Sequence, residues 1–388
     1  MRFILIIYIV SIRDINMTKH LLVSGQYSQI GVLNRLVADG YKNISYKLII
    51  SNLPKGIKEK VLEDSTRRSE YLGKCIKNTS LSPITTGLCS KFKDVAYFAI
   101  CFMLCMDNFK FDGVFLNCPT GIGEYPIIEK GNQLGIPTIL LENGIWPEKW
   151  PKKNSLYAIG NPSNILCTSI HMKNKYLEVG KPESKLTLTG MPCFDVYYGM
   201  KRKEPNEEVT VLWAVGIIEM INSRTYNTQV PDFCCIPVKY KEFFNLCSVA
   251  TSMPDVKFIL SYKGWAGLDK DRFTGLPPNV KVVVGKPWEE LIDKVDVVVG
   301  GYSTTVAESI YVGVPTITPK CDIPLYDYKG SVIEAPDWET DTVCRLIRDA
   351  VGSEVHNEDF INHYFSHNLD GKATDRVVEK IKELIPNV

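Results

Sequence analysis

Short apolar runs of strand length recur along the chain and alternate with longer segments whose apolar residues have helical spacing. In the first half, six such runs end in Gly, Ser, Asn or Glu: 20–25, 46–51, 112–117, 137–142, 164–169 and 185–190. Segments with helical spacing lie between them, for example 94–106 and 125–133. Buried strands separated by helices predict parallel sheets built from right-handed crossovers.

The second half repeats this alternation. Its apolar runs are 209–215, 256–262, 280–285, 295–300 and 315–319. A polar stretch at 201–208 separates the halves and is the expected linker. A chain of 388 residues also exceeds one ordinary core. We therefore expect an α/β protein with two doubly wound, Rossmann-like parallel sheets, whose strand carboxyl ends face each other across a cleft.

The charge balance excludes a general attraction to polyanions. The chain has 45 basic and 44 acidic residues and a formal net charge of +1, so we expect no nucleic-acid partner. The 12 cysteines show no paired C-x2-C spacing and no spaced histidines. This pattern indicates reduced thiols in the cytosol rather than a zinc site.

The first sixteen residues, MRFILIIYIVSIRDIN, form an apolar run that resembles a signal peptide. The run is short, no small-residue cleavage site follows it, and about 20 apolar residues are needed to span a bilayer. We expect residues 1–16 to be an extension before a fold that begins at Met17. A peripheral membrane anchor is the alternative.

The stretch 299–318, VGGYSTTVAESIYVGVPTIT, combines a strand end, a glycine pair and a hydroxyl-rich helix start. Glycines allow close approach of a ligand, and free amides at a helix N-terminus suit a phosphate. Glu308, one turn further on, can accept both hydroxyl hydrogens of a ribose. The alternative is an ordinary strand-to-helix turn with a capping-box acid.

The wider segment 279–327 resembles the donor-binding half of GT-B glycosyltransferases that use nucleotide-sugar diphosphates. The resemblance implies these contacts: Pro287 and Trp288 beside the base, Gly301, Ser303, Thr304 and Thr305 at the diphosphate, Glu308 at the ribose, and the loop with Asp327 near the sugar.

Three more stretches, 134–148, 167–195 and 368–385, are similar to the relatives that include UDP-N-acetylglucosamine 2-epimerase and the capsule and teichoic-acid transferases. The second carries the "TG-x-P-x-x-D" exit of the first domain, and the third resembles the terminal helix that crosses back. The resemblance implies an acceptor-side domain at 17–200, a donor-binding domain at 201–370, and a helix at 371–388 that packs on the first domain.

Two departures separate the chain from the epimerases. Residues 117–120 read NCPT where the epimerases have an acid in a "GDT" turn, and residues 262–265 read YKGW where they have "HxNP". The missing acid removes a group that elimination chemistry would need for proton transfer. A transferase is therefore favoured.

Transfer requires stabilisation of the leaving diphosphate and activation of an acceptor hydroxyl. Lys263 follows a strand end and could neutralise the leaving phosphate, with Lys286 as second choice. A solvated lysine in a turn is the other interpretation of each.

For the acceptor's base, the resemblance points to the turn at Glu142, which ends the run 137–142. The same residue could instead cap a helix or support Trp146. Glu124 is a rival base after another strand. Gly25 and Gln26 could contact the acceptor, although a packing turn is the other interpretation of that loop.

Taken together, these features predict a cytoplasmic GT-B enzyme of polysaccharide biosynthesis. It would move a sugar from a nucleotide diphosphate donor, UDP by preference, to a hydroxyl of a glycan or lipid-linked acceptor. We expect no metal or other cofactor, because a helix terminus and lysines can carry the phosphate charge and no D-x-D element occurs in a fitting loop. The alternatives are a UDP-sugar 2-epimerase or hydrolase, and a non-catalytic nucleotide-sugar-binding protein of the same fold.

Overall fold

A computed structural model gives the fold of the chain. It describes residues 19–23, 30–45, 111–117, 124–142, 161–200, 205–214, 241–262, 275–284, 290–291, 294–300, 304–319, 330–353 and 357–386. The predicted strand at 46–51 and the predicted helix at 94–106 lie outside these ranges.

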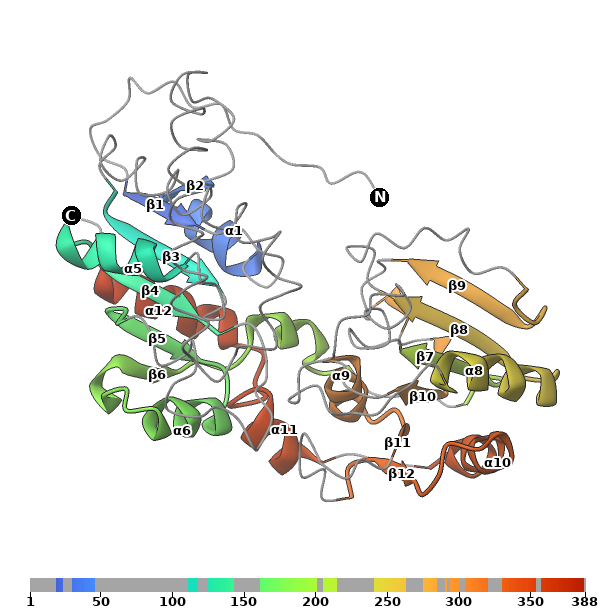
Figure 1. The fold of residues 1–388 in the computed structure, drawn as a ribbon. Coiled ribbons are helices and arrows are strands. Elements are labelled where there is room, and N and C mark those ends of the chain that lie inside the picture. The colour runs from blue at the N-terminus through green and yellow to red at the C-terminus, as the bar shows by residue number, and fades with distance from the viewer. Residues whose placement is uncertain are drawn as a thin grey trace, which may run out of the picture. The chain divides into compact units, whose positions relative to one another are not determined.

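Two sheets, each of six parallel strands, organise the described residues (Figure 1). The first has the order β2-β1-β3-β4-β5-β6, with β1 at His20–Val23, β2 at Lys42–Ser45, β3 at Gly113–Asn117, β4 at Thr138–Leu141, β5 at Asn164–Cys167 and β6 at Leu186–Leu188. The second has the order β12-β11-β10-β7-β8-β9, with β7 at Thr210–Ala214, β8 at Lys257–Tyr262, β9 at Val280–Val284, β10 at Val297–Gly300, β11 at Thr316–Pro319 and β12 at Ile333–Ala335. The predicted α/β fold with two doubly wound parallel sheets is confirmed.

Helices follow most strands. They are α1 at Ile30–Ala38, α5 at Glu124–Gln133, α6 at Ile170–Glu178, α8 at Lys241–Ser252, α9 at Thr304–Val312, α10 at Thr340–Ala350, α11 at Glu358–Tyr364 and α12 at Ala373–Leu384, with short 3-10 turns η4 at Glu183–Lys185 and η5 at Pro192–Tyr197. No helix of the described part of the chain is both long and apolar enough to cross a membrane.

Helices cover both faces of the first sheet, because alternate strand residues point to opposite sides. On one face, Leu116 and Leu140 pack with residues of α5 and α6. On the other, Phe115, Ile139 and Leu141 pack with residues of α1 and α12. A strand that is buried on both faces reads as a continuous apolar run, which is why the sequence predicts these strands well.

The second sheet is built in the same way. Val211 and Trp213 belong to a cluster with residues of α8 and α10. Ile317 of β11 joins this cluster, and its neighbour Thr316 contacts Ser309 of α9. Adjacent residues of a strand point to opposite faces, so α9 covers the face that α8 and α10 leave.

The chain's contacts divide it into two compact units. We call the one that holds β1 to β6 the first unit; it takes the described residues up to Asp195 and again from His363 onward. The second unit takes the described residues from Val196 to Asn362. Helix α12 therefore belongs to the first unit, where Tyr41 donates a hydrogen bond to the Ile385 carbonyl at 2.8 Å.

Candidate functional site

The strand order of the second sheet reverses between β7 and β10. The chain runs from β7 to β8 and β9 on one side, and then returns to place β10, β11 and β12 on the other. In open parallel sheets, ligands bind outside the strand carboxyl ends at such a switch point. The last paired residues there are Ala214 and Gly300, so these two mark the edge of the candidate site.

Gly300 lies where two strands come close together. A Cβ atom at this position would lie 2.9 Å from the Ala214 carbonyl oxygen and 3.1 Å from the Ala214 Cβ. A side chain here would therefore push β10 away from β7. The glycine keeps the strands together at the edge where a ligand would approach.

Helix α9 begins at Thr304, shortly after β10 ends at Gly300. Because the connection is so short, the first turn of α9 lies at the carboxyl end of β10, beside the switch point. Val306, Ala307 and Ile310 are buried and hold the helix on the sheet. The first-turn amides carry the positive end of the helix dipole, which favours an anionic group.

A buried hydroxyl pair fixes α9 to β11. The Oγ atom of Ser309 lies 2.7 Å from Oγ1 of Thr316 and 2.8 Å from the carbonyl oxygens of Thr305 and Val306. Oγ1 of Thr316 also donates to the Val314 carbonyl at 3.1 Å. Sequence reasoning missed this pair, although a serine on the buried face of an apolar helix was a signal for it.

Glu308 lies one turn into α9, next to Ser309. Residues four apart share a helix face, so Glu308 lies on the same face as Thr304, one turn further from the N-terminus. Glu308 and Thr305 are half-buried, whereas Val306 and Ala307 on the opposite side are buried. The predicted contact of Glu308 with a ribose stays a prediction.

Glu142 follows β4 in the first unit and is 2% exposed. The Tyr176 hydroxyl of α6 donates a hydrogen bond to Oε2 of Glu142. The backbone amide of Glu142 donates to the Leu166 carbonyl at 3.2 Å. Burial, and after it the Glu142 carboxylate, raises the pKa of the Cys167 thiol. The carboxylate is thus held inside the first unit by α6, a partner that lies 34 residues away in sequence.

The first sheet also has a switch point, between β1 and β3. The loop after β1 carries Gly25 and Gln26, and α5 begins at Glu124 after β3. The strands β1, β3 and β4 are parallel neighbours, so their carboxyl ends lie at one edge of the sheet, the edge at which Glu142 follows β4. Gly25, Gln26 and Glu124 remain predicted acceptor contacts.

Several other predicted site residues lie outside the described ranges. They are Gly25, Gln26, Lys263, Lys286, Pro287, Trp288, Gly301, Ser303 and Asp327. Of the predicted donor contacts, the structure places Thr304, Thr305 and Glu308 together on the first two turns of α9. Within the described residues, no group of three or more His, Cys, Asp or Glu could hold a metal ion.

No protein-family model and no curated protein matches the sequence. Solved structures do match. The glycotransferase of kitacinnamycin has a TM-score of 0.55 at 14% identity, covering 95% of this chain and 99% of that one. A putative UDP-N-acetylglucosamine 2-epimerase from Listeria monocytogenes has a TM-score of 0.54 at 12% identity, covering 94% and 96%. The chain has the GT-B fold.

Another GT-B structure of similar likeness is MnaA of S. aureus with UDP, which has a TM-score of 0.55 at 11% identity and coverage of 96% of this chain and 98% of that one. Each of these matches extends over both compact units, because each covers nearly the whole of both chains.

Proposed function

We propose that the chain is a glycosyltransferase that moves a sugar from a nucleotide diphosphate donor, a UDP-sugar, to a hydroxyl of a glycan or lipid-linked acceptor. The observation that carries this proposal is the start of α9 at the switch point of the second sheet, beside the tight approach of Gly300 to Ala214. GT-B structures of the same fold include a glycotransferase and a protein with UDP bound, which supports a nucleotide sugar as substrate.

In this proposal, the first-turn amides of α9 hold the diphosphate and Glu308 accepts hydrogen bonds from the ribose hydroxyls. Fixed amide dipoles stabilise charge that develops on the leaving diphosphate without any reorganisation during the reaction. The hydroxyl pair Ser309 and Thr316 keeps the helix in place. Lys263 would add a positive charge at the phosphate, and we expect no metal to be needed.

The acceptor oxygen would form a bond to the anomeric carbon while the bond from that carbon to the diphosphate breaks and UDP leaves. A carboxylate must take the proton of the acceptor hydroxyl. Glu142 could do so only if an acceptor hydroxyl replaced or joined Tyr176 as its hydrogen-bond donor, because the carboxylate is buried against that residue. Glu124 remains the rival base, and direct attack with either base would invert the anomeric configuration.

The donor site can be tested by UDP binding, measured by calorimetry. Glu308→Ala should weaken UDP binding by about tenfold or more, since each hydrogen bond to a charged group contributes about 1.5–3 kcal/mol. Glu334→Ala removes an exposed carboxylate from β12 in the same unit and should leave the affinity unchanged. Equal affinity of the parent and Glu308→Ala would remove the ribose assignment.

A sugar-nucleotide 2-epimerase is the second candidate, favoured by the similar likeness to the Listeria structure. The two reactions differ in their need for an acceptor. Incubation of the protein with UDP-N-acetylglucosamine alone should leave the sugar unchanged if the chain is a transferase. Formation of the 2-epimer without any acceptor would establish the second candidate instead.

A further inference from the structure

A buried hydroxyl without a partner lies near the carboxyl end of β11. Thr318 is 3% exposed, and within the described part of the chain its Oγ1 atom has no hydrogen-bond partner. Buried polar atoms are nearly always hydrogen-bonded, because an unsatisfied one lowers stability. The Thr318 hydroxyl therefore needs an acceptor that the described residues do not supply.

Thr318 lies on the face of the second sheet that α9 covers. Ile317 belongs to the cluster on the opposite face, whereas Thr316 contacts Ser309 of α9. Since alternate residues of a strand share a face, the Thr318 side chain points to the α9 side, as that of Thr316 does. Oγ1 of Thr316 has the Val314 carbonyl as its acceptor at 3.1 Å. Of these two threonines, the one nearer the carboxyl edge of the sheet is left without an acceptor.

Thr318 is level with the first turn of α9. From Thr316, two strand residues lead about 6.6 Å towards the carboxyl edge, at about 3.3 Å per residue. From Ser309, five helical residues lead back about 7.5 Å to Thr304, at about 1.5 Å per residue. Both paths start from the contact of Ser309 with Thr316 and run towards the edge where β10 ends and α9 begins. The Thr318 hydroxyl therefore lies beside the opening turn of the helix.

The neighbours of Thr318 within the sheet do not occupy its hydroxyl. Continued by one residue, the pairing of β10 with β11 places Gly300 beside Thr318, so no side chain stands on that side. On the other side Thr318 pairs with Glu334 of β12, which is exposed and makes no hydrogen bond to the hydroxyl. A ligand reaches this buried atom only by displacing what covers it. A charged acceptor forms the stronger hydrogen bond that such a displacement requires.

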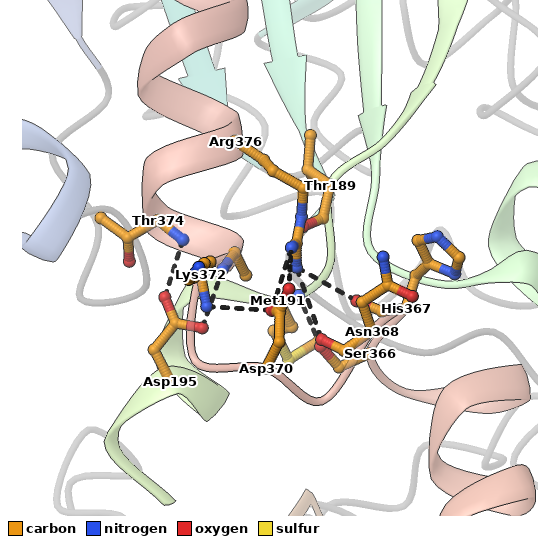
Figure 2. Close-up of polar contacts among 11 residues, drawn as sticks. Thr189, Met191, Asp195, Ser366, His367, Asn368, Asp370, Lys372, Thr374 and Arg376 are labelled. Atoms are coloured by element: carbon orange, nitrogen blue, oxygen red, sulfur yellow. Dashed lines mark hydrogen bonds and ion pairs between the residues drawn. The ribbon is translucent and has the colours of Figure 1, made fainter. Parts of the chain in front are cut away.

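The start of α12 shows how this chain binds an anion at a helix. The two carboxylate oxygens of Asp195 accept hydrogen bonds from the backbone amides of Ala373 at 2.9 Å and Thr374 at 2.7 Å (Figure 2). A carboxylate has two oxygens for such amides, whereas a terminal phosphate has three. A phosphate held in the same way at α9 would keep an oxygen for a further donor.

We propose that the Thr318 hydroxyl donates a hydrogen bond to a diphosphate held at the first turn of α9. The inference rests on the proposed function, in which that turn holds the diphosphate of the donor. It adds a ligand from β11 to the amides of α9, so that a strand and a helix of the second unit bind the same group. The hydroxyl would gain its acceptor only in the complex, so binding would remove the destabilisation that it causes in the free protein.

Thr318→Val and Thr318→Ser test the assignment, because valine keeps the branched shape and serine keeps the hydroxyl. In calorimetry, Thr318→Val should weaken the binding of both UDP and inorganic pyrophosphate about tenfold or more, as expected for the loss of a hydrogen bond to a charged group. Thr318→Ser should keep most of the affinity of the parent. Urea unfolding without ligand should show Thr318→Val to be at least as stable as the parent, because the substitution removes an unsatisfied hydroxyl.

Ser331→Ala is the matched control. Ser331 is fully buried, and its Oγ atom also lacks a hydrogen-bond partner among the described residues. It precedes β12, which begins at Ile333, and so lies at the amino edge of the same sheet. Its removal should leave the affinity for both ligands unchanged. Equal losses of affinity in Ser331→Ala and Thr318→Val would overturn the proposal, because they would show a general effect of removing a buried hydroxyl.

The remaining outcomes separate this inference from the proposed function. Parent affinity for both ligands in Thr318→Val would overturn the inference and leave the nucleotide site standing. A loss of stability together with the loss of affinity would show a structural role and overturn it as well. Pyrophosphate binding without UDP binding in the parent, weakened in Thr318→Val, would support the inference and contradict the nucleotide function. Binding of neither ligand to the parent would overturn both.

Discussion

Replacement of Gly300 by alanine tests the candidate site through its backbone. The new methyl group would lie 2.9 Å from the Ala214 carbonyl oxygen, a distance at which neighbouring atoms must move. The neighbour is backbone of the paired strand β7, so relief requires the strands to separate at their carboxyl ends. Overpacking of this kind costs about 1–3 kcal/mol of unfolding free energy.

The separation should also weaken nucleotide binding. The strand β10 leads directly into α9, so a displaced Gly300 moves the first turn of the helix. Hydrogen bonds from amides to a phosphate depend steeply on distance and angle. We expect the affinity for UDP to fall about tenfold or more in Gly300→Ala, in proportion to the loss of one charge-assisted hydrogen bond.

Urea unfolding and UDP calorimetry on the same preparation separate the two effects. Gly31→Ala in helix α1 is the control. Its Cβ would lie an ordinary 3.7 Å from the Thr374 hydroxyl of α12, so this substitution should cost no stability. An unchanged unfolding free energy in Gly300→Ala would refute the tight approach of the strands. A loss of stability with full UDP affinity would refute the placement of the nucleotide at this edge.

Two further predictions concern buried and paired carboxylates. Tyr176→Phe should lower the unfolding free energy by about 1–3 kcal/mol, because it removes a hydroxyl that donates to the buried carboxylate of Glu142. Tyr198→Phe, at an exposed position, should leave the unfolding free energy unchanged. Equal losses in the two variants, measured by urea unfolding, would contradict the role of the hydrogen bond. For Asp370, burial acts to raise the pKa, but the hydrogen bonds from Arg376 and from the Lys372 amide outweigh it and leave the pKa below its ordinary value. The stability from this group is present above the ordinary carboxyl pKa and is lost as the pH falls through the lower folded value. The unfolding free energy should therefore fall less steeply below pH ~4 in Arg376→Gln than in the parent, as measured by circular dichroism during acid unfolding. Identical pH profiles would contradict this linkage.

The central strands could be predicted from the sequence, because burial on both faces makes them uninterrupted apolar runs. The run at 137–142 contains β4 at Thr138–Leu141, and the run at 295–300 contains β10 at Val297–Gly300. The edge strands are different. β12 has only the residues Ile333–Ala335, with an exposed Glu334 between them, and this length and composition carry no strand signal.

Part of the candidate site could likewise be predicted from the sequence, and part of it could not. The start of α9 and the position of Glu308 follow from local rules, because hydroxyl residues precede helices and helical spacing sets the next turn. The burial of Glu142 depends on Tyr176, which a helix brings back from 34 residues away. Local sequence patterns do not show contacts between residues so far apart. The sequence could therefore place Glu142 at a strand end, but it could not show which partner the carboxylate has.

Two helix N-termini of the first unit bind acceptors from the chain itself, and neither lies at the switch point of its sheet. At α12 the opening amides bind the carboxylate of Asp195, so the chain itself supplies the anion. At α6 the hydroxyl of Ser169 accepts from the Met172 amide at 3.2 Å. Helix α9, in contrast, begins beside the switch point of its sheet. Topology and helix electrostatics therefore point to the same turn of the second unit, and the proposed function depends on that agreement.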